Sequence, residues 1–208
     1  MSDFTLPPRQ TVIVGMTGSG KTGFGIKYLL NADGIACRFI FDDLGQMSAR
    51  LKIPHAATAN ELENAIASRW VIYNPHRMFP GDVKRAFRFF CDWTFKVSRR
   101  GRGRKIIFAD EIWRFQDREE IPPELATVSQ MGRVENLELV TATQRPQKLN
   151  DSILGSATEL VCFRLTESVH LRKIESMGAD ASAVSRLPLG QYISYDLIKG
   201  GQFSGRIF

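Results

Sequence analysis

An eight-residue segment constrains this chain more than any other. It begins at Gly15, reads GMTGSGKT, and fits the pattern G-x-x-x-x-G-K-[ST] in full. The apolar run Val12-Ile13-Val14 precedes it, and a helical stretch that ends at Leu30 follows it. A phosphate-binding loop needs a strand before it and a helix after it, and both are present. The segment therefore predicts an α/β fold with a phosphate site between the first strand and the first helix.

The residue types of this segment suit a nucleoside triphosphate. Its glycines let the backbone wrap closely around phosphates, while backbone N–H groups and the helix N-terminus supply partial positive charge. Lys21 is expected to reach the β- and γ-phosphates, and the Thr22 hydroxyl to bind magnesium. The predicted ATP-binding residues are Gly15, Met16, Thr17, Gly18, Ser19, Gly20, Lys21 and Thr22.

A magnesium–ATP site also needs a carboxylate that anchors the metal and a base that orients the attacking water. The segment 105–111, KIIFADE, is the only apolar strand that ends in this way. Asp110 is expected to hold the magnesium through water, and Glu111 to polarise the water. The alternative is that both acids only cap the next turn of the chain. Asp42 and Asp43 also follow an apolar run, but they come right after the first helix, the position of an edge strand, which favours the later pair.

Short β-branched runs alternate with amphipathic stretches along the chain, which is typical of a mainly parallel sheet flanked by helices. Residues 189–208 are expected to form a closing β-hairpin around Lys199, Gly200 and Gly201. The aromatic stretch 87–95 has helical spacing, which favours a buried helix face over a nucleic-acid stacking surface. The expected strands are 11–14, 38–41, 70–73, 105–109, 137–141 and 159–163, and helices should begin at or near residues 21, 59, 82, 123, 151 and 168.

The composition fits one globular domain spanning residues 1–208, because 43% of the residues are hydrophobic and 24% charged. No run approaches the ~18 to 20 apolar residues of a membrane span, so an integral membrane protein is not expected. The three cysteines form no CxxC pair, and this indicates a reducing, intracellular setting. The 28 Lys and Arg residues exceed the 22 Asp and Glu residues, which favours a polyanionic partner. The three histidines are widely separated, so no metal site besides magnesium is expected.

Two further polar groups flank the strand expected at 137–141. Gln144 follows it within Thr143-Gln144-Arg145-Pro146, where it can contact the γ-phosphate or the attacking water. A purely structural glutamine fits the spacing equally well. The pair Gly132-Arg133 lies just before the strand.

In this order, four motifs resemble the FtsK and HerA superfamily of DNA-pumping ATPases. They are GMTGSGKT, IIFADE ending at Asp110 and Glu111, Gly132-Arg133, and TQRP at 143–146, and together they cover roughly residues 11–163. In its length and its lack of appended domains, the chain is similar to the genome-packaging ATPases of tailless icosahedral viruses with an internal membrane. The resemblance implies a P-loop fold of the RecA-like, additional-strand type.

The resemblance also implies roles and partners. Gln144 would be the γ-phosphate sensor, and Arg133 the arginine finger donated to a neighbouring subunit's ATP. A surface salt bridge is the alternative for Arg133, and Arg145 is the alternative finger. A homo-oligomeric ring, usually a hexamer, would move double-stranded DNA into a preformed capsid. Capsid vertex proteins would be partners, and the packaging vertex of the virion and the host cytoplasm would be the locations.

Other interpretations stay open. The basic run 99–105, RRGRGRK, should lie at the sheet edge away from ATP, either as a DNA or capsid contact or as a solvated loop. The assembly ATPases of filamentous phages share the motifs but typically carry a membrane segment. A P-loop kinase would use the basic run as a lid near the nucleotide, and a nucleotide-dependent switch would need neither Glu111 nor Gln144.

Overall fold

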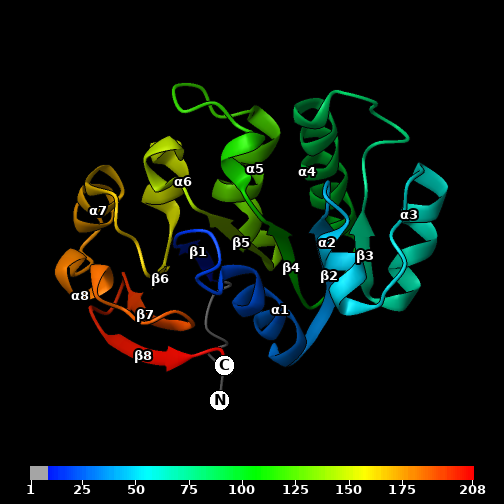
Figure 1. Ribbon diagram of the computed structural model, residues 1–208. Helices are drawn as coiled ribbons and strands as arrows, with labels where there is room; N and C mark the ends of the chain where they lie inside the picture. The colour runs from blue at the N-terminus through cyan, green and yellow to red at the C-terminus, as the bar shows by residue number, and fades with distance from the viewer. Residues whose placement is uncertain (1–8) are drawn as a thin grey trace, which may run out of the picture.

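The computed structural model describes residues 9–208 (Figure 1). Within this range, one eight-stranded sheet has the order β3-β2-β4-β5-β1-β6-β7-β8. The strands up to β6 pair in parallel, while β7 and β8 add in antiparallel fashion. The predicted mainly parallel sheet with a C-terminal hairpin is confirmed. The strands are β1 (Gln10–Val14), β2 (Ile35–Phe41), β3 (Trp70–Tyr73), β4 (Arg104–Ala109), β5 (Leu137–Thr143), β6 (Glu159–Phe163), β7 (Gln191–Asp196) and β8 (Gln202–Arg206).

The expected helix starts are confirmed, and side-chain caps fix three of them, at α3, α4 and α6. The Thr58 hydroxyl accepts the Glu61 N–H before α3, and the Asp82 carboxylate accepts the Arg85 N–H before α4. Two short helices, α2 and α8, were not predicted from the sequence. They have only six and five residues, which is too short to show helical periodicity. The helices are α1 (Lys21–Asn31), α2 (Gln46–Leu51), α3 (Ala59–Ala65), α4 (Val83–Arg100), α5 (Pro123–Met131), α6 (Asp151–Ser156), α7 (Ser168–Glu175) and α8 (Ala181–Ser185).

The sheet separates two apolar layers. Figure 1 shows α1 on one face and α4, α5 and α6 on the other. Alternate strand residues face each layer, so that Phe39 and Ile107 pack with α3 to α8, while Ile40 and Phe108 pack with α1 and α2. Phe87 and Phe90 of α4 are fully buried against Phe41, which confirms the buried-face interpretation of that aromatic stretch.

One expectation about strand position is wrong. The strand before Asp42 and Asp43 is β2, and it lies between β3 and β4 instead of at the edge. The short strand β3 pairs on its outer side, so the second strand in the chain is not the outermost. The carboxyl end of β2 therefore reaches the same edge of the sheet as the P-loop.

This arrangement brings three motifs together. Strands β4, β5 and β1 are neighbours and run parallel, so their carboxyl ends meet at one edge of the sheet. That edge carries the P-loop after β1, Asp110 and Glu111 after β4, and Gln144 after β5. In the described part of the chain, no helix is long and apolar enough to cross a membrane.

Candidate active site

The backbone of residues 15–20 forms a tight turn between β1 and α1. A Cβ atom on Gly15 would lie 2.6 Å from both the Phe163 Cβ and the Ser19 Oγ, so only glycine fits there. Gly20 has a φ of +117°, a conformation that L side chains rarely adopt. The Met16 N–H donates to the Arg164 carbonyl at 2.8 Å, which ties the loop to the end of β6. The sequence is thus built for close approach of a phosphate to the backbone.

Lys21 begins α1 and is only 6% exposed. Its ammonium donates to the Met16 carbonyl at 3.1 Å and lies 3.9 Å from the Glu111 Oε1. Burial lowers the pKa of Lys21, and the negative charges of Glu111 and Asp110 act against that shift. The side chain folds back over the loop, where its remaining donors can meet the oxygens of an anion.

Thr22 and Asp110 meet although 88 positions separate them, because α1 starts beside the end of β4. The Thr22 hydroxyl donates to the Asp110 Oδ2 at 2.8 Å. A hydroxyl and a carboxylate oxygen fit magnesium, which proteins bind through one or two carboxylates, phosphates and water. Among the described residues, no group of three or more His, Cys, Asp or Glu could hold a metal ion. The Thr22 hydroxyl and the Asp110 carboxylate are the oxygens that fit a magnesium ion bound with a nucleotide.

Glu111 adopts a left-handed backbone conformation with φ of 49°. Its N–H donates to the Asp110 Oδ1 at 2.9 Å, while the second Asp110 oxygen faces Thr22. No side chain caps the short helix that follows, at Ile112–Arg114. The Glu111 Oε2 accepts the Gln144 N–H at 3.2 Å and the Trp113 indole N–H at 2.8 Å. The Gln144 Oε1 in turn accepts the Thr17 hydroxyl at 2.5 Å. Gln144 thus connects the P-loop to the candidate base.

A cleft of about 510 Å³ is lined by Thr17, Lys21, Thr22, Asp110, Glu111 and Gln144. Sequence reasoning did not place Arg114 there, and it disfavoured Asp43. The Arg114 guanidinium and the Asp43 carboxylate form an ion pair of 2.7 Å at the cleft wall. Burial raises the pKa of Asp43, although Arg114 opposes the shift. The end of the hairpin also lines the cleft, at Ile207 and Phe208, and only the long-range fold reveals this.

The structure does not bring Arg133 into this cleft. Arg133 lies in the short helix η3 (Gly132–Glu135), before the amino end of β5, at the opposite edge of the sheet. Its Nη2 donates to the Ser156 carbonyl at 2.6 Å. Arg145 lies on the cleft side, with its guanidinium carbon 4.7 Å from the centre of the Trp113 ring. Within one chain, Arg145 therefore lies nearer the predicted nucleotide site than Arg133 does.

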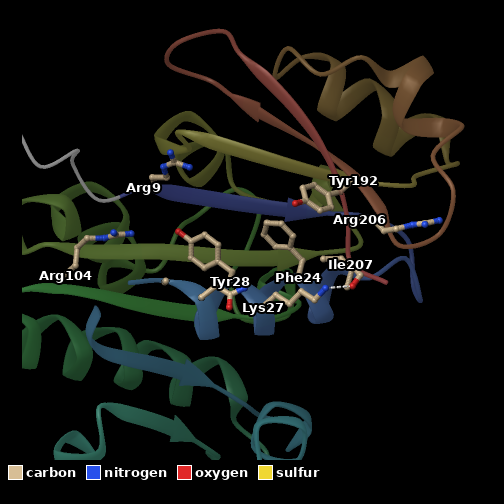
Figure 2. Close-up of a pocket in the computed structure, with 10 residues that line it drawn as sticks. Arg9, Phe24, Lys27, Tyr28, Arg104, Tyr192, Arg206 and Ile207 are labelled. Atoms are coloured by element: carbon tan, nitrogen blue, oxygen red, sulfur yellow. Dashed lines mark hydrogen bonds between the residues drawn. The ribbon is translucent and has the colours of Figure 1, made fainter. Parts of the chain in front are cut away.

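A second cavity, of about 450 Å³, lies beside α1 below the C-terminal strands (Figure 2). Phe24, Tyr28 and Tyr192 line its middle. Among its cations, Lys27 donates to the Ile207 carbonyl, Arg104 pairs with Glu138 at 2.9 Å, and Arg9 contacts Glu159 at 3.5 Å. These three cations are thus used within the chain, and Arg206 is a fourth cation of the cavity lining.

Comparison with known proteins supports the motif-based prediction. No protein-family model matches the chain. Protein P9 of Pseudoalteromonas phage PM2 is 23% identical over 167 residues, which cover 80% of this chain and 73% of that protein. The genome packaging NTPase B204 from Sulfolobus turreted icosahedral virus 2, in complex with AMPPCP, superposes with a TM-score of 0.74 at 20% identity, over 97% of this chain and 99% of that one.

A further solved structure, VirB4 of Thermoanaerobacter pseudethanolicus, has a TM-score of 0.71 at 13% identity, covering 96% of this chain and 89% of that one. At these identities the likeness shows the fold. The P-loop fold that the resemblance to the FtsK and HerA superfamily implied is confirmed at that level. The chain therefore has a P-loop NTPase fold that it shares, over nearly its whole length, with a viral genome-packaging NTPase.

Proposed function

We propose that this chain is an ATP-driven motor that moves double-stranded DNA into a preformed viral capsid. The observation that carries the proposal is the meeting of five residues from the start of α1 and the ends of β4 and β5: Lys21, Thr22, Asp110, Glu111 and Gln144. The end-to-end likeness to a genome packaging NTPase adds support. The net charge of +6 suits a partner with a phosphate backbone.

The proposed reaction is hydrolysis of ATP at its γ-phosphate. Lys21 and the loop N–H groups would bind the β- and γ-phosphates, and Thr22 and Asp110 would hold the magnesium, which neutralises charge on their oxygens. Glu111 would accept a proton from the attacking water as its oxygen bonds to the γ-phosphorus. The bond from that phosphorus to the bridging oxygen then breaks, and ADP and phosphate leave. Gln144, held by Thr17 and beside Glu111, would sense whether the γ-phosphate is present.

In this proposal residues 1–208 act as one ATPase domain in a homo-oligomeric ring, a hexamer, around the DNA. Arg133 would supply the arginine finger to a neighbouring subunit's ATP. Since Arg133 lies at the amino edge of its own sheet, the ring must place that edge over the cleft of the next subunit. Arg133 must also leave the Ser156 carbonyl when it reaches the phosphate. The motor would work in the host cytoplasm at the packaging vertex of the virion, against capsid vertex proteins.

The kinase interpretation receives less support from the structure. A phosphate-clamping lid must lie over the nucleotide, whereas the basic run 99–105 connects the end of α4 to the amino end of β4. That position is at the sheet edge away from the cleft, as the sequence predicted. The Gln144 contacts to Thr17 and Glu111 also give this glutamine a place in a hydrolytic site.

The experiment that tests the proposal is ATP hydrolysis with and without double-stranded DNA. We expect magnesium-dependent turnover that DNA stimulates, and a loss of about a hundredfold or more in Lys21→Ala because the phosphates lose their main cation. Lys199→Ala, an exposed lysine of the hairpin turn, is the matched control. Turnover that ignores both DNA and Lys21 would contradict the proposal, and transfer of phosphate to a small molecule would favour a kinase.

A further inference from the structure

Trp113 connects the candidate base to two cations at the surface. It lies in the short helix η2 (Ile112–Arg114), directly after the acidic pair. Its indole N–H donates to the Glu111 Oε2 at 2.8 Å. The Arg145 guanidinium carbon and the Lys148 ammonium lie 4.7 and 4.8 Å from the centre of its ring. One side chain thus contacts both the predicted chemistry and an exposed positive surface.

The bond from Trp113 fixes the direction of the Glu111 carboxylate. The Oε2 atom accepts two donors, the indole N–H and the Gln144 backbone N–H. The Oε1 atom is left on the Lys21 side, where a water beside a bound γ-phosphate would lie. Because a free glutamate side chain samples several rotamers, a fixed donor at one oxygen aims the other. Loss of the indole donor should therefore affect turnover more than nucleotide binding.

The two cations on the Trp113 ring are available for an anion. Arg145 and Lys148 are exposed, and neither forms an ion pair within residues 9–208. Their backbone is fixed, since the Gln116 amide donates to the Lys148 carbonyl at 2.8 Å and the Arg145 N–H donates to the Thr143 hydroxyl at 2.9 Å. Charged hydrogen bonds to phosphate oxygens are stronger than contacts with a ring face, so a phosphate would draw both cations toward itself.

We propose that Trp113 is a positioning residue for Glu111, and that Arg145 and Lys148 on its ring are a contact for the phosphate backbone of double-stranded DNA. Binding of that backbone would act on the base through the indole. DNA would then stimulate hydrolysis through one connected set of side chains. The inference rests on the proposed function, in which Glu111 is the base and DNA the moving partner.

The first test replaces Trp113 with Phe, which keeps an aromatic ring but removes the N–H donor. We expect kcat without DNA to fall about tenfold while KM for ATP stays unchanged, because the lost bond orients the base and does not bind substrate. Trp93→Phe is the matched control, since the Trp93 indole donates to Glu63 at 3.1 Å, away from the cleft. Wild-type kcat in Trp113→Phe would overturn the positioning role, and so would an equal loss in Trp93→Phe.

The second test compares Lys148→Ala with Lys199→Ala, in which the same charge is removed from an exposed turn. With a short blunt-ended DNA duplex, Lys148→Ala should lose at least half of the DNA stimulation, while its basal turnover and that of Lys199→Ala stay at the wild-type level. Full stimulation of Lys148→Ala would overturn the DNA contact while leaving the ATPase intact. A wild type that DNA does not stimulate would also overturn it, and Trp113→Phe would still decide the positioning role.

A fluorescence measurement keeps the second test independent of turnover. In a Trp70→Phe, Trp93→Phe background, Trp113 is the one remaining tryptophan of the sequence. Addition of the duplex should shift its emission, and Lys148→Ala should reduce that shift. An emission that the duplex leaves unchanged would contradict a DNA contact at this ring. If Lys21→Ala hydrolyses ATP like the wild type, the proposed function itself has failed, which this optical readout separates from failure of the contact.

Discussion

The Thr22 hydroxyl donates a 2.8 Å hydrogen bond to the Asp110 carboxylate, and this contact joins the start of α1 to the end of β4. Two oxygens from separate motifs thus meet, and both belong to residues that would hold a magnesium ion. Both residues were predicted as magnesium ligands from motif position alone. The contact is the physical link between the P-loop and the acidic strand.

Asp110→Asn should abolish most ATP hydrolysis through weaker magnesium binding. The amide removes the negative charge but keeps the shape, so activity should fall about a hundredfold and the magnesium needed for half-maximal turnover should rise. A magnesium titration of turnover measures both effects. An unchanged magnesium dependence would contradict the assignment of Asp110.

Asp42→Asn serves as the control and separates the two acidic pairs. Both Asp42 carboxylate oxygens are used to cap α2, because they accept the Met47 and Ser48 N–H groups at 3.0 and 2.8 Å. The substitution should therefore lower the free energy of unfolding by about 1 kcal/mol and leave the magnesium dependence unchanged. Chemical denaturation measures the free energy of unfolding, and the same magnesium titration measures the metal dependence. A changed magnesium dependence would indicate that the metal site lies at the end of β2.

Glu111→Gln should trap ATP. Glutamine can still accept the Trp113 and Gln144 N–H groups through its carbonyl oxygen, so the cleft should keep its shape, but it cannot accept a proton from water. We expect kcat to fall by about 10² to 10⁴ while nucleotide binding persists. Single-turnover kinetics and nucleotide retention measure these quantities. Near-normal turnover would mean that another group is the base.

A mixing experiment separates Arg133 from Arg145. Arg133→Ala alone and Lys21→Ala alone should both be inactive, but their mixture should regain activity because a shared site combines one intact loop with one intact finger. Arg145 lies on the cleft side of its own chain, so Arg145→Ala mixed with Lys21→Ala should gain much less. ATPase rates of mixed rings measure the difference. Rescue of Arg145→Ala but not of Arg133→Ala would assign the finger to Arg145.

Glu138 should make stability depend on pH. Its side chain is fully buried on β5, and burial raises its pKa from 4.5 to about 8. Between these two pKa values the folded state holds a proton that the unfolded state loses. The contribution of Glu138 to the free energy of unfolding should therefore be largest below pH 4.5 and should decline as the pH rises to about 8.

Glu138→Gln removes that titration and keeps hydrogen-bonding groups for Tyr28 and Arg104, its contacts in the fold. The difference in unfolding free energy between the two proteins should change by at least about 1.4 kcal/mol across this range, the equivalent of one pKa unit. Urea denaturation at several pH values measures it. Parallel curves for the two proteins would show that Glu138 has an ordinary pKa.

The local motifs of the site were predictable because their chemistry lies in short segments. GMTGSGKT fixes both a backbone shape and a charge, and an apolar run ending in Asp110-Glu111 marks the end of a buried strand. The order of the strands was not predictable from the segments. Edge position depends on which strand pairs outermost, so β2 was wrongly placed and Asp43 was disfavoured.

The position of Arg133 at the edge opposite the P-loop could have been predicted from the sequence. It precedes the strand at 137–143, and amino ends of parallel strands lie at the edge opposite the P-loop. The sequence pattern could not predict contacts between distant segments of the chain. The Gln144 N–H bond to Glu111 and the approach of Phe208 to the cleft depend on packing between distant segments.

The most direct test of the central claim is movement along DNA. A third strand bound to a duplex reports translocation when a motor displaces it. We predict that the wild type displaces the strand when ATP and magnesium are present, and that Glu111→Gln, which binds ATP without hydrolysing it, does not. Displacement that proceeds equally without ATP, or no displacement by a wild type that hydrolyses ATP, would contradict a DNA-moving motor.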